Sequence, residues 1–81
     1  MIQYKIPQWR PDWQDLKKWD RYHSSRELAI QAAREFMDSF LFEDLDDYFP
    51  AEIVIKTEDG REVAFIVDVE LKPTFIARLK I

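Results

Sequence analysis

The residues best suited to bind another molecule lie between positions 8 and 23, where aromatic and basic side chains are interleaved. Such rings can stack on nucleic-acid bases or fill pockets of a protein partner, and the neighbouring cations can contact phosphates or carboxylates. The interpretation that needs no ligand is that Trp13 and Leu16, with Trp9, cover the open end of a small core. The candidate contact residues are Trp9, Arg10, Trp13, Lys17, Lys18, Trp19, Arg21 and Tyr22.

A second candidate surface is acidic. Four carboxylates fall within five positions, at Glu43, Asp44, Asp46 and Asp47. A calcium loop needs oxygen ligands at fixed offsets and a glycine for its turn, and this run has neither. We therefore expect a solvated acidic face that could meet a basic surface on a partner.

The only histidine, His23, lies three residues after Asp20 and four before Glu27. On one continuous helix these side chains would cluster as metal ligands. However, Ser24 followed by Glu27 is typical of a capping box, which starts a new helix at this point. Capping also explains Ser24 and Ser25 better than a hydrolase triad does, because no glycine-rich oxyanion turn lies nearby. We predict no metal ligands and no catalytic residues.

The composition excludes further kinds of chemistry. The chain has 81 residues with one Gly and no Cys, which leaves no disulfide framework, thiolate metal site or glycine-rich phosphate loop, so we expect no cofactor. Hydrophobic residues make up 47%, too many for a disordered chain, and the length fits one domain over residues 1–81. The N-terminus lacks the apolar stretch of a secretory signal, and the longest apolar run, Ala64–Val67, is too short to span a membrane. We therefore expect a cytoplasmic protein without membrane contact.

Charge is divided unevenly along the chain, whose net charge is −4. Residues 1–23 carry five bases and three acids, whereas residues 24–49 carry two bases and seven acids. Domains that bind nucleic acid are usually strongly basic on one face. The acidic total, together with Asp12, Asp15 and Asp20 inside the aromatic segment, therefore favours a protein partner over nucleic acid.

The elements that must position these residues follow from hydrophobic periodicity. Residues 2–6 alternate between apolar and polar side chains, which predicts a short strand. In the 8–23 segment, large apolar side chains recur every three or four positions, at Trp9, Trp13, Leu16, Trp19 and Tyr22. This spacing predicts a helical turn or two beginning near Pro11–Asp12, with an irregular segment as the alternative.

Residues 25–41 follow the capping box and carry an apolar stripe at helical spacing, which predicts an amphipathic helix. Residues 42–49 predict a short acidic helical turn ended by Pro50. From residue 52 to residue 81 the period becomes two, which predicts an antiparallel meander of three strands.

Turn chemistry predicts the register of this meander. A three-residue loop with Gly60 in the left-handed conformation pairs Ile55 with Val63 and Ile53 with Phe65, which places the large apolar side chains on one face. A three-residue loop at 72–74 does the same for the second hairpin. Its predicted pairs are Leu71 with Phe75, Val69 with Ala77, Val67 with Leu79, Phe65 with Ile81 and Asp68 with Arg78.

These elements predict an α+β fold of two layers, β-α-β-β-β, with one main amphipathic helix packed on a mainly antiparallel sheet. The pattern leaves open whether the N-terminal strand lies at an edge or beside a strand of the meander. On the polar face of the sheet, Val54, Ala64, Ile66 and Ile76 could form a small apolar island that binds a partner or a second copy.

The sequence therefore favours a small non-catalytic interaction protein, of adaptor or inhibitor type, that docks on a macromolecular partner. We expect that partner to be a protein, and the chain itself to be a monomer or a weak homodimer. The alternative is single-stranded nucleic-acid binding through the aromatic and basic segment 9–22.

Overall fold

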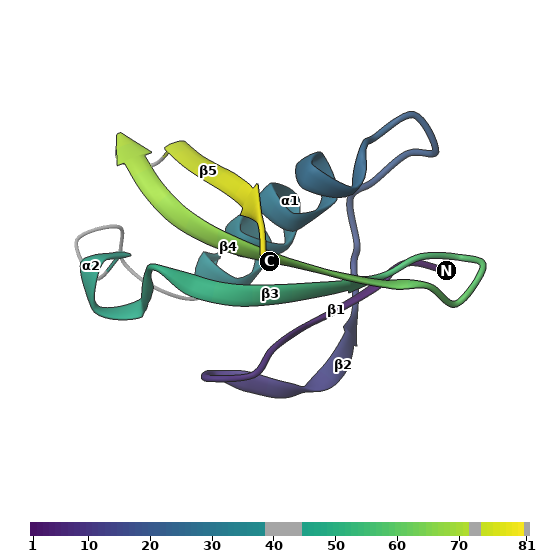
Figure 1. Ribbon diagram of the computed structural model, residues 1–81, viewed down its shortest axis with the longest axis horizontal. Coiled ribbons are helices and arrows are strands. Elements are labelled where there is room, and N and C mark those ends of the chain that lie inside the picture. Colours follow the sequence, from purple (N-terminus) through teal and green to yellow (C-terminus); the bar gives the residue numbers. More distant parts are fainter. Residues whose placement is uncertain (39–44, 72–73, 81) are drawn as a thin grey trace.

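A computed structural model describes residues 1–38, 45–71 and 74–80, and in these ranges the protein has one sheet and one main helix (Figure 1). The five strands of the described ranges are antiparallel to their neighbours and lie in the order β2-β1-β3-β4-β5. This arrangement confirms the predicted two-layer α+β fold. The elements are β1 (Gln3–Ile6), β2 (Arg10–Asp15), α1 (Ser25–Met37), α2 (Leu45–Tyr48), β3 (Ala51–Lys56), β4 (Glu62–Leu71) and β5 (Thr74–Leu79).

Helix α1 begins at the predicted capping box. The Glu27 backbone N–H donates to the Ser24 hydroxyl (3.2 Å), and the Ser24 backbone N–H donates to a carboxylate oxygen of Glu27 (2.9 Å). This backbone bond is the main reason that the pKa of Glu27 lies below its ordinary value. The buried stripe packs on β3, β4 and β5, and its three alanines let the helix approach the sheet closely. The stripe consists of Leu28, Ala29, Ala32, Ala33, Phe36 and Met37.

The predicted ends of two elements fall partly outside the described residues. Helix α1 is described as far as Met37 and its C-cap Asp38, so positions 39–41 of the predicted helix lie outside. The predicted acidic turn at 42–49 contains α2, and positions 42–44 likewise lie outside the described residues.

Segment β2 is a strand, so the predicted helical turn from Pro11–Asp12 is wrong. It pairs antiparallel with β1, and Tyr4 lies opposite Gln14. Trp9 and Trp13 fit a helix and a strand equally well, because their separation of four is also an even number and strand side chains alternate with a period of two. The N-terminal strand β1 lies between β2 and β3, beside a strand of the meander.

The first hairpin of the meander has the predicted register. Ile55 lies opposite Val63, and Ile53 lies opposite Phe65. Gly60 has a φ of 87°, a left-handed conformation that glycine adopts without steric cost. The single glycine of the chain therefore allows the turn that accompanies this pairing of β3 and β4.

In the second hairpin the predicted side chains point toward the core, but the predicted pairing of β4 with β5 is wrong by two residues. Phe75 lies opposite Val69 rather than Leu71. In the observed register Phe75 is buried against Phe49, with ring centroids 5.0 Å apart, whereas Leu71 at the end of β4 is 70% exposed. The observed pairs are Phe65 with Leu79, Ile66 with Arg78, Val67 with Ala77, Asp68 with Ile76 and Val69 with Phe75.

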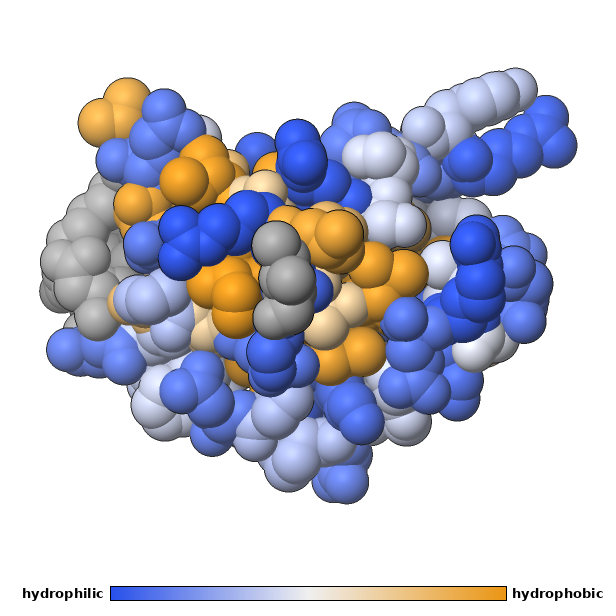
Figure 2. Space-filling model, in the orientation of Figure 1, coloured by the Kyte–Doolittle hydropathy of each residue, from blue (hydrophilic) through white to orange (hydrophobic). Residues whose placement is uncertain are grey.

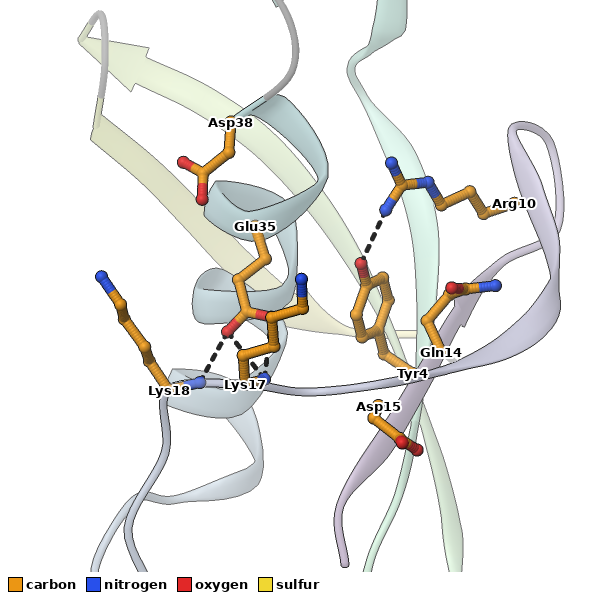
Figure 3. A pocket seen from close by; sticks show the side chains of 8 residues that line it. All are labelled: Tyr4, Arg10, Gln14, Asp15, Lys17, Lys18, Glu35 and Asp38. Atoms are coloured by element: carbon orange, nitrogen blue, oxygen red, sulfur yellow. Dashed lines mark hydrogen bonds between the residues drawn. The ribbon is translucent and has the colours of Figure 1, made fainter.

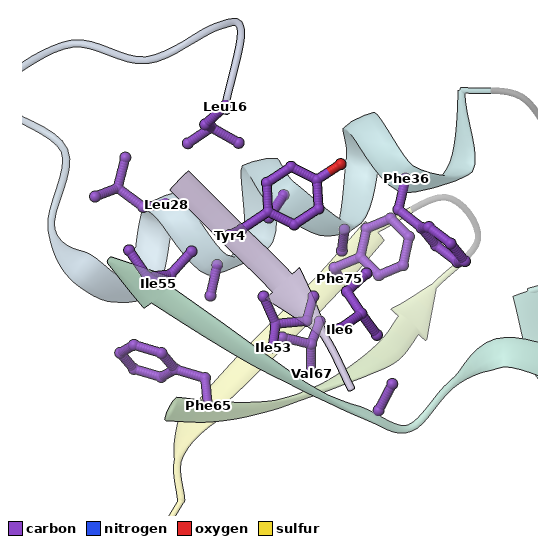
Figure 4. Packing of buried hydrophobic residues seen from close by; sticks show 14 of the residues in the cluster. Tyr4, Ile6, Leu16, Leu28, Phe36, Ile53, Ile55, Phe65, Val67 and Phe75 are labelled. Carbon is purple, nitrogen blue, oxygen red and sulfur yellow. The ribbon is translucent and has the colours of Figure 1, made fainter. Parts of the chain in front are cut away.

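The hydrophobic core lies between α1 and the sheet (Figure 4). Its centre is formed by Ile6, Ile53, Ile55 and Val67, which have no exposed surface and come from three adjacent strands. Beyond the helix, the core continues under the β1–β2 hairpin, where Leu16 is also buried. The hairpin and α1 thus share one core, and the gap between them is covered by polar side chains.

We predict that Gly60→Ala lowers the free energy of unfolding by about 1 kcal/mol, because a β-carbon disfavours positive φ. No atom lies within 4 Å of the added carbon, so the cost is conformational rather than a clash. Gly60→Asn should cost less, because Asn tolerates the left-handed region. Urea denaturation of the two variants measures both effects, and equal stability of Gly60→Ala and wild type would contradict the prediction.

Candidate functional site

The predicted aromatic and basic residues do not form one continuous surface. Because neighbouring side chains of a strand point to opposite faces, β2 sends Gln14 toward the side of α1 and Trp13 toward the opposite side. Arg10 joins Gln14 on the α1 side, where both line the same cleft. The hairpin therefore divides the candidates between two surfaces.

Trp9 lies at the turn of this hairpin and contacts α2. Its indole N–H donates to the Tyr48 backbone carbonyl (2.9 Å), and the two rings meet edge to face with centroids 5.2 Å apart. The ring is still 43% exposed. Trp9 therefore fixes the hairpin to α2 and leaves part of its surface available for contact.

The remaining aromatic candidates lie in the connection between β2 and α1. Trp19 is half-buried against the core, whereas Tyr22 is 81% exposed and carries the Arg21 guanidinium over its ring (5.3 Å). The Asp20 backbone N–H donates to Nδ1 of His23 (3.2 Å), so the histidine takes part in a local turn. Within the described ranges, no group of three His, Asp or Glu side chains is placed to hold a metal ion.

The acidic candidates are only partly described. Asp47 lies exposed on α2. Asp46 belongs to the same helix, but its side chain lies outside the described part of the structure. Glu43 and Asp44 also lie outside the described residues.

The first surface is the sheet face opposite α1, here called the open face and formed by Trp13, Val54, Ala64, Ile66 and Ile76. Val54 lies directly opposite Ala64, and Ile66 follows Ala64 on the same face of β4. Figure 2 shows hydrophobic side chains gathered over the middle of the sheet, with hydrophilic side chains around them. Ile76 on the edge strand β5 is 44% exposed. The predicted apolar island is therefore present.

Two lysines border the open face at Trp13. The ammonium nitrogens of Lys5 and Lys56 lie 4.7 and 4.9 Å from the centroid of its ring, close enough for cation–π attraction. Neither lysine forms an ion pair with a carboxylate of the described ranges, whereas Lys80 at the other border pairs with Glu52 (2.8 Å). This corner can therefore receive an anionic group beside an aromatic ring.

Sequence reasoning missed Lys5 and Lys56 as contact residues. In their strands, both lysines occupy positions whose side chains point away from the core, and the alternation of polar and apolar residues in the sequence already indicates this. What it could not show was the neighbouring strand that carries Trp13, because the 8–23 segment was predicted to be helical.

The second surface is a cleft of about 200 Å³ between the β1–β2 hairpin and α1 (Figure 3). It brings together three of the predicted contact residues: Arg10, Lys17 and Lys18. The other lining residues were not among the predicted contact residues; they are Tyr4, Gln14, Asp15, Glu35 and Asp38.

Arg10 is held rigidly on the hairpin side of this cleft. Its guanidinium lies 5.0 Å from the ring centroid of Phe36 and donates to the Tyr4 hydroxyl (3.0 Å). Burial raises the pKa of Tyr4 above its ordinary value near 10, and the charge and hydrogen bond of Arg10 oppose that rise. Tyr4 is therefore a neutral acceptor for Arg10 at physiological pH.

Glu35 holds the opposite side of the cleft together. Its carboxylate accepts the backbone N–H of Lys17 (2.9 and 3.1 Å to its two oxygens) and that of Lys18 (2.9 Å). The Gln31 amide donates to the same carboxylate (3.1 Å). One carboxylate of α1 thus fixes the chain just after β2 and directs two lysines to the cleft.

We predict that Glu35→Ala lowers the free energy of unfolding by about 2 kcal/mol, because two backbone N–H groups lose a charged acceptor. Hydrogen exchange at the Lys17 and Lys18 amides should become faster than in wild type. Arg34→Ala, an exposed position on the same helix, serves as the control. Unchanged exchange at both amides would show that Glu35 does not hold this segment.

We also predict that stability falls as pH rises above about 10, and that Tyr4→Phe reduces this fall. The folded pKa of Tyr4 is raised, so the unfolded chain releases the proton first and alkaline pH favours unfolding. Urea denaturation at about pH 8 and about pH 11 measures the difference. An equal loss of stability in wild type and Tyr4→Phe would contradict the assignment.

Comparison with known proteins gives no relative from which a function could be transferred: no protein-family model, curated protein or solved structure matches the chain. In the described ranges, no helix is long and apolar enough to cross a membrane. The open face and the cleft therefore rest on geometry alone.

Proposed function

We propose that this protein is a small non-catalytic interaction protein that docks on a protein partner through its open face. The observation that carries this proposal is the run of partly or well exposed apolar side chains Ala64, Ile66 and Ile76 on the sheet face that α1 does not cover, beside the buried Val54. Contiguous apolar surface with a polar border is typical of protein interfaces. Trp13 adds an aromatic anchor at one end.

The charges around the open face support a protein rather than a polyanion. Lys5 and Lys56 lie at Trp13, but Glu62 lies opposite Lys56, and Asp68 lies opposite Ile76. A mixed border of this kind suits the polar rim of a protein interface.

Single-stranded nucleic acid is the second candidate ligand for this face. The observation that favours it is Trp13 with two ammonium groups near its ring, since a base can stack on the indole while the lysines contact phosphates. Such binding would weaken steeply with salt and would not depend on Ile76.

The test compares two substitutions on one strand. Ile76 belongs to the open face, whereas Leu79 is 56% exposed and lies opposite Phe65 on the other face. We predict that Ile76→Lys weakens binding of a purified partner about tenfold or more and that Leu79→Lys does not. Trp13→Ala should weaken it similarly. Titration calorimetry with a partner recovered by photo-crosslinking from position 76 measures these constants.

Three results would contradict the proposal. Equal binding by Ile76→Lys and wild type would place the interface elsewhere. An equal loss of binding affinity in Ile76→Lys and Leu79→Lys would indicate a general effect of the added charge. Salt-dependent binding of an oligonucleotide that Trp13→Ala abolishes, without any protein partner, would favour the second candidate.

A further inference from the structure

Arg10 is a cation that forms no ion pair with a carboxylate of the described residues. Its guanidinium is positioned by the Phe36 ring and by the Tyr4 hydroxyl, which are both uncharged. Arginine carries its charge at all physiological pH values and presents several N–H donors in a planar fork. One donor is used by Tyr4, so further donors are left for an anion that enters the cleft.

The cations that face Arg10 across the cleft are positioned through their backbone rather than through their ammonium groups. Lys17 and Lys18 are held by their backbone N–H groups, so their ammonium groups are not used to fix the segment. The Glu35 carboxylate accepts these two N–H groups and the amide of Gln31, but it keeps its negative charge and so disfavours a strongly anionic ligand. Figure 3 shows Arg10 and Tyr4 on one side of the cleft, and Lys17, Lys18 and Glu35 on the other.

The remaining carboxylates limit the charge that the cleft can accept. Asp15 accepts a hydrogen bond from Gln3 (3.1 Å) and points away from Arg10 (Figure 3). Asp38 lies at the end of α1 and borders the cleft. With Glu35 and Asp38 close by, a group with one negative charge is accommodated better than one with two.

We propose that the cleft between the β1–β2 hairpin and α1 binds a carboxylate group, with Arg10 as its main partner and Lys17 as the second cation. A volume of about 200 Å³ suits such a group with a short carbon chain. The Gln14 amide, which also lines the cleft, can donate a further hydrogen bond. This site lies on the α1 side of the sheet, so it is separate from the open face and does not depend on the docking proposed there.

The carboxylate could belong to a small monocarboxylate or to an acidic side chain of a peptide, and titrations distinguish these sources. The probes are butyrate, a terminally blocked tripeptide with central glutamate, and inorganic phosphate. They are added to the isotopically labelled full chain at low ionic strength, and NMR follows the Arg10 side chain, the Tyr4 ring and the Lys17 amide. We expect saturable shifts with butyrate or the tripeptide, and weaker binding of phosphate.

Substitutions assign the shifts to the cleft. Arg10→Gln and Lys17→Gln should each raise the dissociation constant about tenfold. Arg26→Gln, on the exposed side of α1, should leave it unchanged. Lys17→Gln retains the backbone bonds to Glu35, so it tests the site even where Arg10→Gln disturbs the fold.

Each outcome of these titrations decides for or against the site. Saturation by butyrate alone assigns a small-molecule ligand, and saturation by the tripeptide assigns a peptide ligand. Absence of saturable shifts, tighter binding of phosphate than of either carboxylate, or unchanged affinity in Lys17→Gln would overturn the proposal.

Discussion

A single helix cannot cover a five-stranded sheet, and much of this structure follows from that constraint. An α-helix is about 10 Å wide and neighbouring strands lie about 4.8 Å apart, so one helix covers two or three strands. Helix α1 packs on β3, β4 and β5, which leaves the β1–β2 hairpin without a helical cover. The apolar side chains of β1 must therefore be shielded by other means.

The shield is built from the hairpin and from the chain that follows it. Tyr4 and Leu16 are almost completely buried, and Trp19 packs against the same core. Arg10 lies across the Phe36 ring and so extends the cover toward α1 with a cation rather than an apolar side chain. Polar side chains that complete the cover also line the cleft, so charged groups gather where the helix does not reach.

The sequence predicted those parts of the fold that a local signal specifies, such as a turn glycine or a capping box. The three-residue loop with Gly60 was the register that put the large apolar side chains of the first hairpin on one face, and Ser24 with Glu27 marked the start of α1. The second hairpin had two registers that put the same side chains on the same face, and only the burial of Phe75 against Phe49 decides between them. That contact joins residues far apart in the chain, so local pattern could not reveal it.

The candidate site was less predictable for a related reason. Arg10, Lys17 and Lys18 were recognisable by type, but their meeting depends on Glu35, which lies on another element. The spacing of Trp9 and Trp13 fits a helix and a strand, so the sequence could not show that β2 sends alternate residues to two surfaces.

The connection between β2 and α1 is held by hydrogen bonds at both ends, and this matters for protein engineering. Glu35 holds it at Lys17 and Lys18, and the capping box holds it at Ser24. The Tyr22 tip between these two points is almost fully exposed. Because each doubling of loop length costs only about 0.6 kcal/mol, this tip is a natural place to insert an epitope or a fluorophore-binding peptide. Both candidate surfaces would then remain free to be studied with the reporter in place.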